Sequence, residues 1–356
     1  MQRQPLLRHS KLVRYLTVTY LGLVVYTSLH PFSEWRAPAG AVRNFLTAPW
    51  PAYFTWADLL LNVVAYVPAG ALLALVLLPF MRAGAAALTA GLLGIALSLM
   101  IEILQVFLPG RIPSNTDLLC NAIGSVLGAG TAVVLAGRGL LSGRLYHLRQ
   151  SQFQSGATAD ICFVLLALWL ATQFNTEIRL FGNGDVRQLL PAVLEVRYSP
   201  DVYVLLEAAI TGLSFCGVAL MLTAISRSLA ATIVSVLALL ASAVALKSLA
   251  ASVLFESGNA MLWITSGATW GIFIGGVLWL SLIVVPRPLQ ITSATTFTAL
   301  AMALVNAAPD NPYLDASLRA WQHGHYASLN DLTSVISSVW PFAAIAFLSY
   351  LAYRLR

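Results

Sequence analysis

The sequence predicts an all-α, polytopic membrane protein with about ten transmembrane helices. Three observations support this class. Apolar residues make up 59% of the 356 residues and charged residues only 10%, whereas soluble domains contain about a quarter charged residues. The mean hydropathy is +0.80. Apolar runs of about 20 residues, the length that crosses a bilayer, recur along the chain.

The predicted spans follow one another from end to end of the chain. They cover residues 12–29, 57–79, 84–108, 117–136, 158–175, 202–225, 229–254, 261–285, 291–307 and 334–353. The first span follows a basic segment, as a signal peptide does. No small-x-small cleavage site comes after it, so we expect an uncleaved first helix. The ninth span gives the weakest signal because it is rich in Thr and Ala.

The basic residues predict that both termini lie on the cytoplasmic side, because Lys and Arg concentrate in cytoplasmic loops. With this orientation, the cytoplasmic loops and termini hold twelve of the twenty basic residues and the loops on the outside hold seven, while Lys247 lies within a span. Of the fourteen acidic residues, only Asp160 lies at an inner end. The long segments 30–56, 176–201 and 308–333 all fall outside. The alternating charges of 176–201 predict a solvated face there.

Charge and cysteine content argue against several classes of function. The net charge is +6, but the basic residues fit membrane anchoring, and no basic patch interleaved with aromatic residues predicts nucleic-acid binding. Apolar runs contain all three cysteines, Cys120, Cys162 and Cys216. His323 and His325 near Asp331 form only a weak zinc pattern, without a third histidine. We therefore predict neither a metal nor another cofactor.

Three consecutive spans each carry one polar stripe. The stripes are Asp58 and Asn62; Ser98, Glu102 and Gln105; and Asp117, Asn121, Gly124 and Gly128. Spacings of three and four place each set on one helical face. A polar stripe in lipid is costly unless it faces protein, water or a ligand. We therefore expect the three stripes to face one another.

Glu102 and Arg111 are the two strongest single candidates. A carboxylate inside a membrane indicates function by default; the alternative for Glu102 is a structural hydrogen bond to Gln105, Asn62 or Asn121. Arg111 presents a planar fork suited to an anionic head group. Its alternative is an ion pair with Asp117.

The other members of the stripes fit structural roles first. Asp58 and Asp117 lie at predicted helix N-termini, where an acidic side chain caps free N–H groups. Asn62 and Asn121 lie one turn deeper and can hydrogen-bond across helices. Gly124 and Gly128 form a small-x3-small face that favours close helix packing.

The order and spacing of these residues resemble the VanZ-like family. The matching patterns are Asp-x3-Asn-x5-Pro-x-Gly at 58–70, Ser-x3-Glu-x2-Gln at 98–105, and Arg-x5-Asp-x3-Asn-x2-Gly-x3-Gly at 111–128. The resemblance covers about residues 15–136. It implies a four-helix membrane domain at 1–150, a C-terminal membrane extension at 151–356, and residence in the bacterial inner (cytoplasmic) membrane. The family is named for a protein associated with low-level teicoplanin resistance.

The extension contains residues whose spacing is similar to that in the first domain. An offset of 214 residues relates Arg111, Ser114 and Asp117 to His325, Ser328 and Asp331, and an offset of 205 relates Gly70 and Arg82 to Gly275 and Arg287. These offsets predict that spans 7–10 are a degenerate parallel repeat of spans 1–4. The alternative is chance similarity between apolar segments.

The leading hypothesis for function is a polar pocket in the outer leaflet that faces outward. Its predicted lining is Asp58, Asn62, Glu102, Gln105, Arg111, Asp117 and Asn121. It would bind or move a phospholipid, a lipid-linked cell-wall precursor or a lipoglycopeptide. One alternative is a lipid-processing hydrolase or transferase, with Glu102 as general acid or base and Asp117 as electrostatic partner. The other is a structural scaffold.

Overall fold

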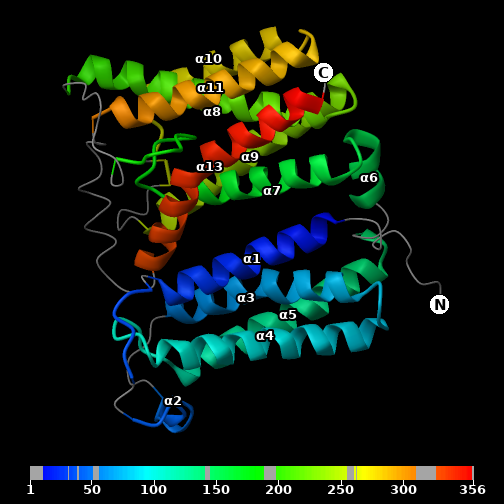
Figure 1. Ribbon diagram of the computed structural model, residues 1–356, viewed down its shortest axis with the longest axis vertical. Coiled ribbons are helices and arrows are strands. Elements are labelled where there is room, and N and C mark those ends of the chain that lie inside the picture. The colour runs from blue at the N-terminus through cyan, green and yellow to red at the C-terminus, as the bar shows by residue number, and fades with distance from the viewer. Residues whose placement is uncertain are drawn as a thin grey trace. The chain divides into compact units, whose positions relative to one another are not determined.

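The computed structural model of the protein describes residues 11–30, 32–37, 40–50, 56–140, 145–187, 198–254, 260–261, 263–309 and 326–354. Over these residues the chain is helical and contains no β-strand; an isolated bridge pairs Phe153 with Ser226. The chain divides into two compact units, Met1–Ser151 and Gln152–Arg356, whose helices are labelled in Figure 1.

The N-terminal unit is a bundle of four long helices. Its elements are α1 (Leu12–Leu29), α2 (Asn44–Thr47), α3 (Trp56–Leu77), α4 (Ala83–Gln105), α5 (Asn115–Gly137) and α6 (Leu145–Gln152). Helices α3, α4 and α5 all pack against one another, and α1 packs on α3 and α4 (Figure 1). Many large apolar side chains point outward, as expected for helices surrounded by lipid.

Glycines bring α3 and α5 into backbone contact. A Cβ atom added at Gly124 would lie 2.2 Å from the Val63 carbonyl oxygen, and one at Gly128 would lie 1.9 Å from that of Val67. Gly70 of α3 approaches α5 in the same way, because its added Cβ would lie 2.0 Å from the Ser125 carbonyl oxygen. No side chain fits at these contacts, so the predicted small-residue packing face is confirmed.

The C-terminal unit is built around one central helix. Its elements are α7 (Ala157–Thr172), α8 (Pro200–Ile225), α9 (Leu229–Leu254), α10 (Ser266–Leu282), α11 (Arg287–Ala307) and α13 (Tyr326–Arg354). Nearly all of α8 from Glu207 onward is buried, and α7, α9, α10 and α11 contact it. Helix α13 packs on α7 and α11.

Each of the ten predicted spans corresponds to an apolar helix. Among the described residues, eight helices are long and apolar enough to cross a membrane, whereas α7 and α10 have only 16 and 17 residues. At 1.5 Å per residue these two reach about 24–26 Å, less than the roughly 30 Å hydrocarbon core. Helix α10 starts later than predicted because Thr265 caps it, its hydroxyl accepting from the Ala268 N–H at 3.0 Å. The orientation of the termini stays a prediction.

The segment that follows α7, residues 173–187, is packed inside the C-terminal unit, and we call it the inner segment. Its Asn175 and Phe181 are fully buried. Asn306 of α11 holds it by accepting from the Val186 N–H at 2.9 Å and donating to the Gly184 carbonyl at 2.7 Å. The prediction of a solvated face is therefore wrong for residues 179–184, which are buried, because helix side chains satisfy the backbone of this segment. Of the other described residues in the predicted range, Tyr198, Pro200 and Asp201 are exposed.

The proposed repeat stays a prediction. Gly70 and Gly275 correspond in it, but they pack against helices that do not correspond. Gly70 of α3 contacts α5, whereas Gly275 of α10 contacts α8, where its added Cβ would lie 2.6 Å from the Gly212 carbonyl oxygen.

Candidate functional site

Glu102 lies in the last turn of α4 and is 2% exposed. Its Oε2 accepts a hydrogen bond from the backbone N–H of Ser114 at 2.8 Å. Ser114 is the N-cap of α5, and its hydroxyl accepts from the N–H groups of Thr116 at 3.2 Å and Asp117 at 3.4 Å. In a capping box the N3 side chain of the same helix satisfies the N-cap N–H. Here a carboxylate from a neighbouring helix does so, at the positive end of the α5 dipole.

Gln105 and Arg111 hold the end of α1. The Gln105 amide donates to the Ser28 carbonyl at 2.9 Å. The Arg111 Nη2 donates to the carbonyls of Thr27 at 3.0 Å and His30 at 2.7 Å, and its Nε donates to His30 at 3.0 Å. The last carbonyls of a helix have no hydrogen-bond donor within it, and these two side chains supply donors to them. Anion binding by Arg111 stays a prediction.

A second layer of polar groups lies one turn below Glu102. The Asn121 amide of α5 donates to the Ser98 hydroxyl of α4 at 2.9 Å, and the Ser125 hydroxyl donates to the Asn121 carbonyl at 2.9 Å. Ser98 and Ser125 are fully buried, and Asn121 is 6% exposed. Two of the three predicted stripes therefore meet through a direct hydrogen bond.

Three buried polar atoms of α3 and α5 lack a hydrogen-bond partner within the described part of the chain. They are Nδ2 of Asn62, the hydroxyl of Tyr66 and Oδ1 of Asn121. Tyr66 is 4% exposed, and its hydroxyl lies near Ser98 but outside hydrogen-bonding geometry. An unsatisfied buried polar atom costs about 1–3 kcal/mol. Such atoms are normally satisfied by water or by a bound polar group, and this set offers both donors and an acceptor.

Tyr66 was missed by the sequence analysis. It stands in an apolar run, where an aromatic residue is expected to be part of the core. Its spacing of four from Asn62, itself four after Asp58, continues the polar stripe of α3. That spacing is the signal that would have found it.

The two aspartates are less informative. The backbone of Asp58 lies in the first turn of α3, but its side chain is outside the described residues. Asp117 lies in the first turn of α5, where its charge suits the helix dipole. A catalytic role for Glu102 with Asp117 stays a prediction.

Across the described residues, no group of three or more His, Cys, Asp or Glu side chains is placed to hold a metal. Cys120, Cys162 and Cys216 are free and buried. The histidine pair at 323 and 325 lies outside the described residues.

These features define a multi-pass helical membrane protein with a buried polar cluster between three helices of its N-terminal unit. Residues 8–136 match the family model described as VanZ/LLP1. The match covers the region where the spacing of the polar residues indicated this resemblance, and it contains every predicted site residue. No curated protein and no solved structure matches the chain.

Proposed function

We propose that the N-terminal unit binds the polar head of an amphipathic envelope molecule in an outward-facing pocket of the outer leaflet. The observation that supports this role is the set of unpartnered buried atoms on Asn62, Tyr66 and Asn121. Burying three such atoms dry would weaken a purely structural bundle, so they need either ordered water or a polar ligand as a partner. A ligand head group with hydroxyl, amide or phosphate groups would satisfy them.

The remaining features of the site suit an amphiphile. Helix α3 exposes Leu60 and Val64, and α5 exposes Ile123 and Val126, so apolar surface flanks the polar cluster and suits an acyl or prenyl tail. Arg111 adds positive charge near the C-terminus of α1 and favours an anionic head. Candidate ligands are a lipid-linked cell-wall precursor, a phospholipid or a lipoglycopeptide.

A link to antibiotic sensitivity follows from this role. Glycopeptide antibiotics act on cell-wall precursors outside the cytoplasmic membrane. A protein that occupies or moves a lipid-linked precursor, or that binds the lipid tail of teicoplanin, would change how readily the antibiotic reaches the precursor. The proposed residence in the bacterial inner membrane gives the pocket access to both.

A scaffold role is the second candidate, favoured by a specific observation. The hydrogen bonds described for Glu102, Gln105 and Arg111 all go to backbone groups of neighbouring elements. On this view the polar stripes serve only to join α1, α4 and α5.

Two tyrosines separate the candidates. The Tyr20 hydroxyl donates to the Ala65 carbonyl at 2.8 Å, whereas the Tyr66 hydroxyl has no partner. Tyr66→Phe removes only an unsatisfied group, so we expect unchanged or higher thermal stability. If that hydroxyl meets a ligand, affinity falls about two- to tenfold, the range for one hydrogen bond. Tyr20→Phe is the matched control, with lower stability and unchanged affinity.

The measurement uses the full chain in lipid nanodiscs, titrated separately with undecaprenyl phosphate and with teicoplanin and followed by thermophoresis. Weaker binding of either probe by Tyr66→Phe alone supports the proposal. If both variants bind like the parent, or if the parent binds neither probe, the pocket does not take these ligands and the scaffold role stands.

A further inference from the structure

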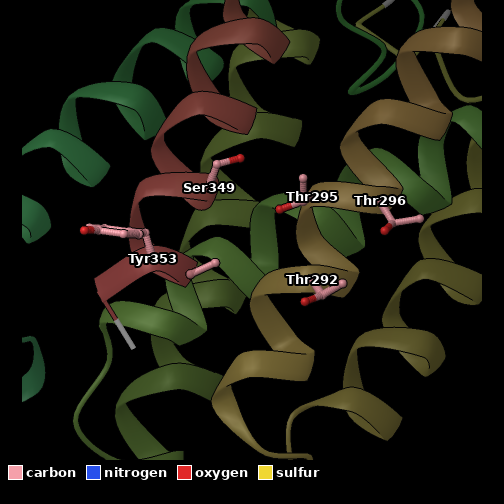
Figure 2. A pocket seen from close by; sticks show the side chains of 6 residues that line it. Thr292, Thr295, Thr296, Ser349 and Tyr353 are labelled. Carbon is pink, nitrogen blue, oxygen red and sulfur yellow. The ribbon is translucent and has the colours of Figure 1, made fainter. Parts of the chain in front are cut away.

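A separate pocket lies between α11 and α13 of the C-terminal unit, with a volume of about 370 Å³. Figure 2 shows its lining side chains on the two helices. They are Thr292, Thr295, Thr296, Ser349, Ala352 and Tyr353. Five of these six side chains carry a hydroxyl group.

The hydroxyl groups fall into two kinds. Those of Thr292 and Thr295 donate to carbonyls of their own helix, Pro288 and Ile291, each at 2.9 Å, so toward the pocket they can only accept. Those of Thr296, Ser349 and Tyr353 make no hydrogen bond to any described residue, and all three side chains are exposed. The pocket therefore offers three free donors beside two acceptors.

The position of the pocket indicates what surrounds it. Helices α11 and α13 are both long and apolar enough to span a membrane. Thr292 lies five residues after Arg287, the first residue of α11, which is about 7.5 Å along the axis. Tyr353 precedes Arg354, the last residue of α13. Thr296 lies nine residues after Arg287, about 13.5 Å along the axis. The pocket thus extends from the head-group level of these spans toward their middle, where the neighbouring molecules are lipids.

The charges at these helix ends favour an anion. Arg287 begins α11 and Arg354 ends α13, with the Arg354 guanidinium 5.0 Å from the Tyr350 ring centroid. The first turn of α11 contains no acidic residue. Basic residues at a membrane surface attract anionic lipids, and the N-terminus of α11 adds a positive dipole end.

We propose that this pocket binds the head group of an anionic glycerophospholipid with free hydroxyls, of the phosphatidylglycerol class. Ser349, between the two helices, would donate to a phosphate oxygen. Thr296 and Tyr353, at the two edges of the pocket (Figure 2), would donate to other head-group oxygens, and Thr292 and Thr295 would accept from glycerol hydroxyls. The volume lies at the small end of the range for ligand pockets, about 300–1,000 Å³. This site belongs to the C-terminal unit and does not depend on the pocket proposed for α3, α4 and α5.

The test compares two multiple variants of the full chain after delipidation in detergent. The first, Thr296→Val/Ser349→Ala/Tyr353→Phe, removes the three free hydroxyls and leaves the helix backbones intact. The control, Thr269→Val/Ser281→Ala, removes two exposed hydroxyls of α10 that bond to their own helix. Native mass spectrometry measures binding of phosphatidylglycerol, phosphatidylcholine and phosphatidic acid, and of soluble glycerol phosphate as competitor.

We expect the parent and the control to prefer phosphatidylglycerol to the other two lipids. The triple variant should bind it about tenfold or more weakly, as the loss of two or three hydrogen bonds implies. Ser349→Ala alone, with a smaller loss, covers the case in which the triple variant does not fold. Equal affinity of parent and variants overturns the proposal. So does full competition by glycerol phosphate, which would make this a soluble-anion site.

Discussion

Replacing Glu102 with glutamine separates the charge of this side chain from its ability to accept a hydrogen bond. In the parent, the Ser114 N–H lies 2.8 Å from the Glu102 carboxylate. In Glu102→Gln, the amide oxygen can still accept this hydrogen bond. Glutamine cannot carry a negative charge at the N-terminus of α5. In Glu102→Ala both the charge and the acceptor are lost, and the N-cap N–H has no partner.

The expected magnitudes differ enough to be measured. A charge near a helix terminus contributes about 0.3–1 kcal/mol, and up to about 2 in partly buried sites. We therefore expect Glu102→Gln to weaken the α4–α5 junction by about 1 kcal/mol. Leaving the partly buried Ser114 N–H without a partner adds up to about 1–3 kcal/mol in Glu102→Ala.

Amide hydrogen exchange of residues 109–120, measured by mass spectrometry on the full chain in nanodiscs, reports this junction directly. Because 1.4 kcal/mol is a factor of ten, exchange should accelerate about fivefold in Glu102→Gln. In Glu102→Ala it should accelerate further, by about five- to 140-fold. Glu34→Gln, at an exposed position, should change nothing. If the glutamine and alanine variants exchange equally fast, the hydrogen bond does not hold the cap; if both match the parent, Glu102 has no capping role.

Two further predictions test the packing of the two units. Gly128→Ala should destabilise the N-terminal unit by about 3 kcal/mol or more, as overpacking does, because the added Cβ meets the α3 backbone. Gly130→Ala has open space around its Cβ and should be neutral or stabilising. A detergent denaturation assay compares the two variants, and equal effects would contradict the close contact. For Asp185, burial alone would raise its pKa, but hydrogen bonds and charge from Arg187 lower the pKa below its ordinary value. Its stabilising effect is therefore present above the unfolded pKa of about 3.9 and lost as the pH falls through the lower folded value. Proteolysis of the inner segment should rise only in strong acid, and Asp185→Asn should remove that rise; a rise already near pH 5 would refute the assignment.

The sequence predicted the helices and the faces that meet, but not which atoms pair. Spacing alone placed Ser98 and Asn121 on facing stripes, since helical periodicity determines direction. The partners of Gln105 and Arg111 are backbone carbonyls 77 to 84 residues away. Every residue has a carbonyl, so no residue type in α1 marks them.

The inner segment escaped prediction for a related reason. Its charges alternate as they do on a solvated surface, and nothing within 173–187 shows that it is buried. The residues that make burial tolerable are Asn306 in α11 and Ser338 in α13, whose hydroxyl donates to the Asp185 carbonyl at 2.6 Å. Each helix contains several other polar residues, so the significance of Asn306 and Ser338 appears only when the helices are assembled.

The three glycine contacts between α3 and α5 limit how a lipid tail can reach the polar cluster. Backbones this close leave no gap for a hydrocarbon chain, so the seam between these two helices is shut along Gly124 and Gly128. If a lipid head group binds at Asn121, the hydrocarbon tail of that lipid must therefore enter from another side. Any opening of the bundle would then move α3 and α5 as a single rigid body, with α1 or α4 as the part that swings away.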